Sequence, residues 1–277
     1  MGMQVNTNIA ALNSYRNLSN TQNDLSKSLE KLSSGLRINH AADDAAGLAI
    51  SQGLQSQVGG LTVTSRNAQD GISVLQTAEG SLSEVQTILQ RVRDLAVQSG
   101  NDSNNTQSRT AIQTEVTALG DELTRISTSA NFNGTQLLTG AATTAGLTFQ
   151  IGAGSVAAND QITVKTTDVA TIATAVAAMT FTDSTAALAS IASADTQITA
   201  VSTARAELGA QQNRFESVIR NLSVSTENLT AAKSRITDTD MASEMVKYTR
   251  SNILAQAGTA MLAQANQSNQ GVLQLLR

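Results

Sequence analysis

The sequence contains no cysteine and no proline, and aromatic residues make up only 2% of it. Without cysteine, the chain has no disulfide framework, no thiolate metal site and no cysteine nucleophile. Without proline, nothing interrupts a long helix, because an interior proline would cost about 3 kcal/mol. With few large aromatic anchors, a core has to be built from aliphatic side chains, which pack economically as helix against helix. The composition therefore favours long helices in a bundle.

Charge is also scarce, since charged residues make up 14% of the chain, against about 25% in typical globular proteins. The 18 basic and 22 acidic residues form no Lys/Arg cluster, so we expect no nucleic-acid partner. Residues 1–23 contain only Arg16, and residues 251–276 contain no ionisable side chain. Because burying an unpaired charge costs several kcal/mol, such uncharged ends are suited to being covered by protein.

The C-terminal stretch is amphipathic, because Asn and Gln interrupt its apolar residues. A membrane-spanning helix needs about 20 predominantly apolar residues, so we expect no membrane insertion. The first residues show neither the charged nor the apolar region of a secretory signal, and we expect no cleaved signal peptide.

Apolar residues recur at alternating steps of three and four, which predicts long amphipathic helices. The first helix ends near Ser33-Ser34-Gly35, the second covers about Ala45 to Ser99, and the third follows a polar loop at 100–106. The first carries Val5, Ile9, Leu12, Tyr15, Leu18, Leu25, Leu29 and Leu32. A coiled-coil seam is predicted between the second helix and residues 201–236, with Leu75, Leu82, Leu89, Leu208, Phe215 and Leu222.

The middle of the chain changes character. Leu147, Phe149 and Ile151 alternate with polar residues, and Ile162 and Val164 do so again across a turn predicted at Asn159-Asp160, which together indicate a small β-hairpin. Residues 168–195 are rich in Ala, Thr and Ser, and we expect them to face the surface. The fold class is therefore mainly α: an elongated antiparallel helical bundle or coiled coil with a small β-hairpin region.

Helical stretches at both ends flank this middle part, which predicts that the two ends lie side by side. We expect a terminal-helix domain of residues 1–43 with 236–277. A second, helical domain would span 44–235, including the β region and an Ala/Thr/Ser-rich outer segment at about 137–195.

Catalytic chemistry is poorly supported by this sequence. His40 is the only histidine, and it stands near Asp43 and Asp44. Successive helical residues point about 100° apart, so these carboxylates would not share a proton, and a loop histidine beside a helix cap is the simpler interpretation. The glycines do not form a phosphate-binding loop. We therefore expect no enzyme activity, no metal site and no cofactor.

Specific motifs at both ends resemble one family. Residues 5–12 (VNTNIAAL), 32–39 (LSSGLRIN), 43–51 (DDAAGLAIS), 209–215 (GAQQNRF) and 234–242 (SRITDTDMA) closely resemble bacterial flagellin in the family's order. The resemblance covers roughly residues 3–140 and 200–277 and indicates a short form that lacks large outer domains. His40 departs from it, because the family usually has a small polar residue there.

The resemblance implies a subunit that self-polymerises into the bacterial flagellar filament and serves motility. Its paired terminal helices would line the tube as an inner core, and its middle helices would form the surrounding layer. The partners implied are copies of the same chain, the flagellar export apparatus, an export chaperone, and cap and junction proteins. The resemblance also implies that the chain is secreted and located in the flagellar filament at the cell surface. The expected polymer-core residues are Val5, Ile9, Leu12, Leu254, Met261, Leu262, Val272, Leu273, Leu275 and Leu276.

By the same resemblance, Gln90, Arg91, Leu95 and Glu115 fall on positions that pack along a protofilament. The resemblance also implies that an animal Toll-like receptor of innate immunity recognises these positions on free subunits. Two alternatives stay open from the sequence: a hook-filament junction protein and a non-polymerising coiled-coil adaptor. Self-assembly of the purified chain separates both from a filament subunit.

Overall fold

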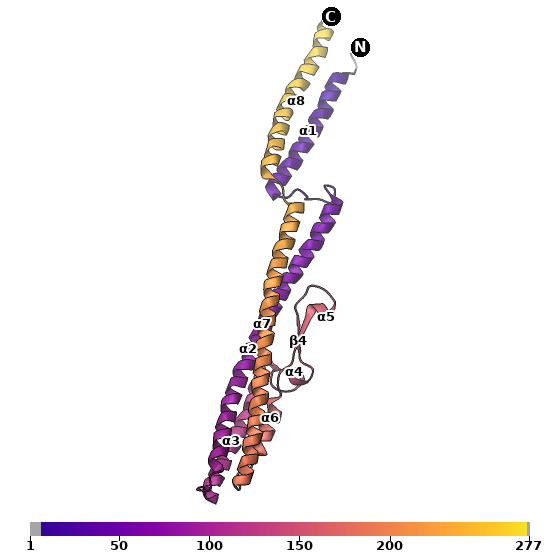
Figure 1. Ribbon diagram of the computed structural model, residues 1–277. Coiled ribbons are helices and arrows are strands. Elements are labelled where there is room, and N and C mark those ends of the chain that lie inside the picture. Colours follow the sequence, from indigo (N-terminus) through magenta and orange to yellow (C-terminus); the bar gives the residue numbers. More distant parts are fainter. Residues whose placement is uncertain (1–6, 276–277) are drawn as a thin grey trace. The chain divides into compact units, whose positions relative to one another are not determined.

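The computed structural model describes residues 7–275, apart from the side chains of residues 141 and 268–275 (Figure 1). The described chain forms two compact units. One holds the residues up to Ser56 together with those from Asn228, and the other holds Gln57–Glu227. The helices that connect the ends of the chain to its middle, α2 (Ala45–Ser99) and α7 (Ser184–Thr237), contribute residues to both units.

The first unit is built on two antiparallel helices, α1 (Ile9–Ser34) and α8 (Met241–Leu275), which lie side by side as expected for the two ends (Figure 1). Asn8 caps α1 by accepting the backbone N–H of Ala11. The helix ends at Gly35, whose φ of 72° lies in the left-handed region that glycine tolerates. The break predicted at this position is therefore confirmed.

Backbone hydrogen bonds join the segment between α1 and α2 to the segment between α7 and α8. Arg37 N donates to Thr237 O at 2.6 Å, and Thr239 N donates to Gly35 O at 2.9 Å. Helix α2 then begins at Ala45, where the Asp44 carboxylate accepts the N–H of Gly47 as an N-cap. Backbone N–H groups donate to the neighbouring Asp43 carboxylate and lower its pKa.

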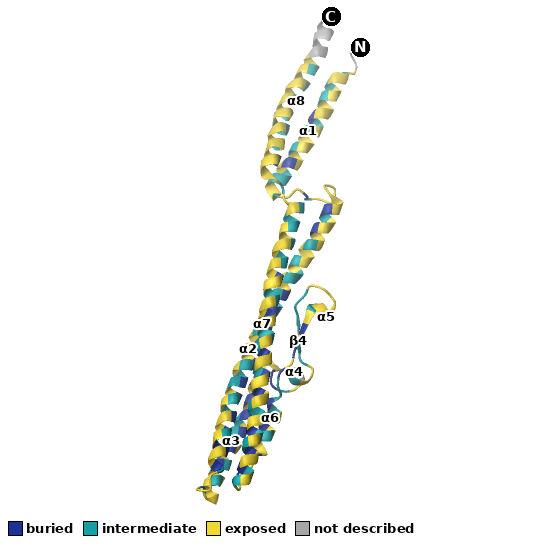
Figure 2. Cartoon of the chain, viewed as in Figure 1, coloured by how far each residue is buried: buried dark blue, intermediate teal, exposed yellow. Residues whose placement is uncertain are grey.

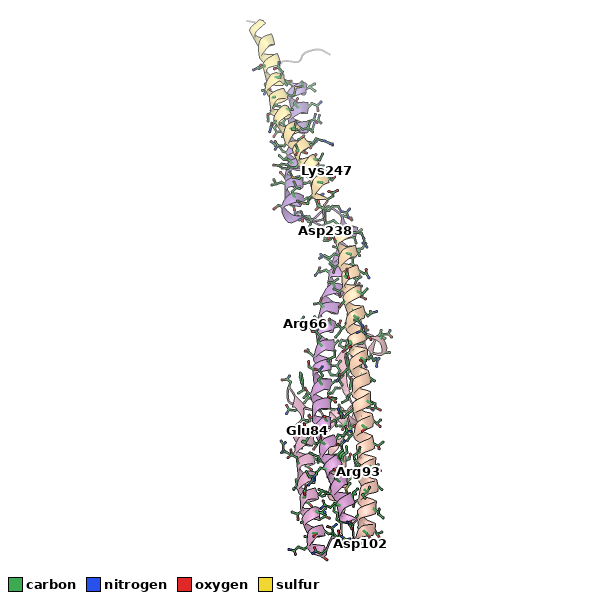
Figure 3. The ribbon with its side chains drawn as sticks, turned by 60° about the vertical axis from the view of Figure 1, so that its left-hand side comes forward. Arg66, Glu84, Arg93, Asp102, Asp238 and Lys247 are labelled. Carbon is green, nitrogen blue, oxygen red and sulfur yellow. The ribbon has the colours of Figure 1, made fainter. Side chains whose placement is uncertain are left out.

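The second unit contains most of α2 and α7 together with α3 (Thr106–Ser129). Its continuous hydrophobic core includes the side chains of Leu75, Leu82, Leu89, Leu208 and Phe215, and Leu222 is buried as well. Ion pairs link α2 to α7 at the edge of this core. Arg205 Nη2 lies 2.6 Å from Glu79 Oε1, and Arg93 Nε donates to Asp195 Oδ1 at 2.6 Å, where Figure 3 labels Arg93.

Two short antiparallel strand pairs belong to the second unit. β1 (Asn131–Phe132) pairs with β2 (Thr135–Gln136), and β3 (Leu147–Gln150) pairs with β4 (Gln161–Val164), with Phe149 opposite Ile162. The predicted hairpin is confirmed. Its connection differs from the prediction, because Asn159 and Asp160 lie in the short helix α5 (Ala157–Asp160) and not in a tight turn. A further short helix, α4 (Ala141–Thr144), precedes β3.

The prediction that the Ala/Thr/Ser-rich segment faces the surface is wrong for much of that segment. Helix α6 (Val169–Ala177) packs against α3 and buries Val169, Ile172, Ala173 and Val176. Met179 and Phe181 are buried beyond it. The apolar residues follow a helical period that the surrounding Ala and Thr residues conceal. No helix within residues 7–275 combines the length and apolar character that crossing a bilayer requires.

Candidate interaction surface

The faces that α1 and α8 turn toward each other carry mainly small or polar side chains. These residues recur at steps of three and four and are buried or half-buried. On α1 they are Ala11, Ser14, Leu18, Thr21, Leu25, Ser28 and Leu32, and on α8 they are Glu244, Tyr248, Ser251, Ala255, Gly258, Leu262 and Ala265. The contact between the two helices therefore buries few large apolar groups.

The two helices approach each other closely in the middle of this seam. A Cβ atom placed on Gly258 would lie 3.1 Å from Leu18 Cδ1, which is tighter than normal packing allows. Glycine thus makes room for the leucine. Nearer the chain ends, Asn8 Nδ2 donates to the carbonyl oxygen of Ala265 at 2.9 Å.

A buried carboxylate marks the opposite end of the seam. Ser28 Oγ donates to Glu244 Oε1 at 2.7 Å, and Lys247 Nζ lies 3.0 Å from Glu244 Oε2. Burial raises the pKa of Glu244, but the bonds from Ser28 and Lys247, with the charge of Lys31, lower it overall. Lys247 itself stays exposed on α8 (Figure 3). The charged state of Glu244 is therefore favoured inside an otherwise nearly uncharged seam.

Apart from the four leucines of the seam, the large apolar side chains of both helices are mostly exposed, and the pair is mostly exposed in Figure 2. On α1 they are Ile9, Leu12, Tyr15 and Leu29, and on α8 they are Met241, Met245, Val246, Ile253, Leu254 and Met261. We call these residues the outer apolar face. A shallow groove of about 470 Å³ runs along α8 and is lined by Met245, Val246, Thr249, Arg250, Ile253 and Leu254. Contiguous apolar surface of this kind marks a site of protein contact.

The residues predicted for a polymer core fall in different places. Ile9, Leu12, Leu254 and Met261 are exposed on the outer apolar face, whereas Leu262 is half-buried on the side of α8 that faces α1. Val5 and Leu276 lie outside the described residues. The side chains of Val272, Leu273 and Leu275 also lie outside them, although α8 includes these positions.

Met245 and Val246, which line the groove on α8, are not among the predicted polymer-core residues. They precede the charge-free stretch 251–276, which was the sequence signal for an interaction surface. Their spacing of eight residues from Ile253 and Leu254 places the four on one side of a helix, and this was the available signal.

A second predicted site lies on the other unit, where α2 meets α3. Arg91 donates from Nε and Nη2 to Glu115 Oε1 at 2.9 and 2.6 Å, and both side chains are partly exposed. Gln90 beside them is exposed. Leu95 is only 2% exposed and belongs to the hydrophobic core, so, unlike the other three residues, it is not part of the accessible surface of the chain.

The described residues hold no group of three or more His, Cys, Asp or Glu placed to bind a metal ion. His40 Nε2 lies 2.8 Å from Glu30 Oε1, and both side chains are exposed. Asp43 is occupied by the backbone of residues 39 and 40, and Asp44 caps α2. Glu30, Asp43 and Asp44 therefore have different partners and do not form one site around His40.

Comparison with known proteins gives matches at both ends of the chain. The family model described as bacterial flagellin N-terminal helical region matches residues 5–143, and the bacterial flagellin C-terminal helical region matches residues 191–276. A flagellin of Halalkalibacterium halodurans is 51% identical over 99% of this chain and 100% of its own length. A flagellin of Bacillus subtilis is 48% identical with the same coverage.

Relatives from a different group and a solved structure agree with these matches. The flagellar filament 33 kDa core protein of Treponema phagedenis is 45% identical over 99% of this chain and 100% of its own length. The crystal structure of Bacillus cereus flagellin is 32% identical, has a TM-score of 0.50, and covers 61% of this chain and 94% of its own.

Proposed function

Because this chain belongs to the bacterial flagellin family, we propose that α1 and α8 are the helices through which copies of it polymerise. The chain is a structural subunit of the flagellar filament and serves motility as part of a homopolymer. One observation carries the proposal for α1 and α8. Their facing sides combine four leucines with mainly small or polar side chains, while the ten large apolar side chains of the outer apolar face are exposed. A second copy of the chain is the partner that covers this face.

The energetics favour assembly over an isolated helix pair. Full burial of a Leu, Ile, Val or Met side chain contributes about 1.5–3 kcal/mol, and the outer apolar face holds many such side chains. Ordering the backbone costs about 1–2 kcal/mol per residue, and a seam in which four leucines are the large aliphatic side chains offsets only part of that cost. We therefore expect residues 1–37 and 240–277 to fold mainly upon assembly. Subunit addition would then be coupled to ordering of the ends.

Limited proteolysis tests this coupling. We expect a protease to remove both ends from free subunits quickly and to leave them intact in the polymer. Equal resistance of the ends in the two states would contradict the coupling. In the filament, residues 1–43 with 236–277 would form the inner layer, and residues 44–235 would form the layer around it.

The surface around Arg91 is proposed as the contact along a protofilament. Gln90, Arg91 and Glu115 are accessible there, whereas Leu95 is buried in the core. The same residues would be the ones that an animal Toll-like receptor recognises on a free subunit. In both roles, Arg91 would contact a group on another protein while it keeps its ion pair with Glu115.

Export of this subunit is proposed to pass through the flagellar secretion apparatus without cleavage of a signal peptide. A cytosolic chaperone would cover the groove on α8 until export, and cap and junction proteins would meet the same terminal helices outside. Mass measurement of the filament protein tests whether a signal peptide is cleaved, because cleavage would make the subunit in the filament lighter than the full sequence.

The central test is polymerisation of the purified chain, followed by electron microscopy after seeding. We expect filaments from the full chain and only isolated particles from a chain that lacks residues 264–277. The truncated chain keeps the whole Gln57–Glu227 unit, so circular dichroism can check that this unit still folds. Filaments of normal length from the truncated chain would overturn the role of α8. A small oligomer of fixed size from the full chain would indicate a coiled-coil adaptor instead.

A further inference from the structure

The exposed methionines of the described chain are concentrated on one helix. Met241, Met245 and Met261 of α8 are 47%, 50% and 62% exposed. Met179, in the Gln57–Glu227 unit, is only 4% exposed and is packed into the hydrophobic core. All three exposed thioethers belong to the outer apolar face, so a reagent that modifies methionine would act on the proposed assembly surface first.

We propose that Met241, Met245 and Met261 form an oxidation site that controls whether a free subunit can enter the polymer. The proposal rests on the assembly role of α8 stated above. The oxidant is a peroxide, with hydrogen peroxide as the simplest case. The thioether sulfur attacks one peroxide oxygen, the O–O bond breaks, and an S–O bond forms. Sulfur loses two electrons to the peroxide, and the second oxygen leaves as hydroxide, which takes the proton from the sulfur-bound oxygen to give the sulfoxide and water.

The product has different physical chemistry from methionine. A sulfoxide is polar and carries a strong hydrogen-bond acceptor, whereas a thioether packs as an adaptable apolar group. Burying the sulfoxide against a neighbouring copy without a donor is unfavourable. Oxidation therefore weakens the contact that polymerisation needs and leaves the core of the Gln57–Glu227 unit intact.

The three positions are not equivalent. Met245 shares its groove with Thr249 and Arg250, and the Arg250 guanidinium is a strong donor to a sulfoxide oxygen. Met261 lies in the stretch 251–276, which contains no charged side chain. Oxidation at Met261 is therefore expected to impair assembly more than oxidation at Met245. This order distinguishes a site-specific effect from general damage.

The test compares free subunits with filaments after treatment with hydrogen peroxide. Peptide mass spectrometry locates the added oxygen, catalase removes the peroxide, and seeding then gives the critical concentration for polymerisation. In free subunits we expect oxygen on Met241, Met245 and Met261 well before Met179. The critical concentration should rise at least tenfold, and methionine sulfoxide reductases should restore it.

Two variants provide matched controls. Leucine has nearly the volume of methionine but resists oxidation, so the critical concentration of M241L/M245L/M261L should be the same before and after peroxide, whatever its value before treatment. M179L keeps the three exposed methionines, so peroxide should raise its critical concentration as much as that of the wild type. Because the triple variant retains Met1, Met3 and Met179, its resistance would assign the effect to α8. Should the triple variant polymerise poorly even before peroxide, M261L alone should remove most of the peroxide effect.

Failure of this inference differs from failure of the proposed function. If fully oxidised subunits polymerise at the wild-type critical concentration, the oxidation site is overturned and α8 can still be the assembly helix. If Met241, Met245 and Met261 are oxidised as fast in filaments as in free subunits, the burial of α8 in the polymer is overturned instead.

Discussion

The two units of this chain place their large apolar side chains in opposite ways. In the Gln57–Glu227 unit, Leu75, Leu82 and Phe215 are at most 1% exposed, and ion pairs lie at the edge of the core. In the α1–α8 pair, most of the larger apolar side chains are exposed, and the seam combines four leucines with small residues such as Ala255 and Gly258. The pair is mostly exposed in Figure 2. The first arrangement is stable for a single chain in water. The second becomes favourable when another copy covers it.

The largest effect on subunit stability is expected from a charge placed in the hydrophobic core of the Gln57–Glu227 unit. Leu82 is 0% exposed, so Leu82→Asp buries an unpaired carboxylate and should destabilise the subunit by about 3–5 kcal/mol. Thermal unfolding of the purified subunit measures this change. The matched control is Val97→Asp on the same helix, where the side chain is 50% exposed and the melting temperature should barely change. Similar melting of both variants would contradict the buried seam.

In the terminal helices, the same kind of substitution is expected to change polymerisation strongly and subunit melting very little. Leu254 is 52% exposed, so Leu254→Asp should leave subunit melting within about 0.5 kcal/mol of the wild type. In the polymer the same carboxylate would be buried. A cost of about 3 kcal/mol there corresponds to an increase of roughly a hundredfold in critical concentration. Leu254→Met, which conserves volume, should polymerise normally. Normal assembly of Leu254→Asp would remove the contrast between the two units.

The difference between the units also explains how far the sequence could predict them. The seam of α2 and α7 carries Leu and Phe at alternating steps of three and four, which gives a strong hydropathy signal. The facing sides of α1 and α8 carry a few leucines among Ala, Ser, Thr and Gly residues, which gives a weaker signal. The apolar stripe predicted for the first helix consequently combines two faces. Leu18, Leu25 and Leu32 turn toward α8, whereas Ile9, Leu12, Tyr15 and Leu29 turn outward.

Two other features were beyond sequence reasoning for similar physical reasons. The pairing of Ser28 with Glu244 joins residues far apart in the chain, and the glutamate on its own is typical of the first turn of a helix. Helix α6 is hidden by its Ala and Thr content. By contrast, Asp44 was predictable as a cap, because a short acidic side chain before an apolar period satisfies free N–H groups.

A smaller effect is expected from the single carboxylate in the terminal seam. The pKa of Glu244 is lowered in the folded pair, so its stabilisation is present above the unfolded pKa of about 4.3. It is lost as the pH falls through the lower folded pKa. Glu244→Gln should cost about 1 kcal/mol at neutral pH and should remove this acid dependence. Hydrogen exchange of α8 amides in filaments, at neutral and acid pH, measures both.

Ser28→Ala provides the comparison for this pair. It removes the bond between the helices and keeps the Lys247 contact, so an intermediate loss of protection is expected. If exchange in α8 has the same pH dependence in Glu244→Gln as in the wild type, then Glu244 does not contribute to pairing of the helices.

The smallest effect on stability should come from the partly exposed ion pair of the Gln57–Glu227 unit. Arg91 and Glu115 side chains are 56% and 43% exposed, so solvent screening limits their pairing to less than about 1 kcal/mol in a double-mutant cycle with Arg91→Ala and Glu115→Ala. If this surface is also a contact along a protofilament, Arg91→Ala should raise the critical concentration by more than its effect on melting explains. Equal changes in both would assign Arg91 to the single chain alone, because a residue that contacts only its own chain acts on assembly through subunit stability.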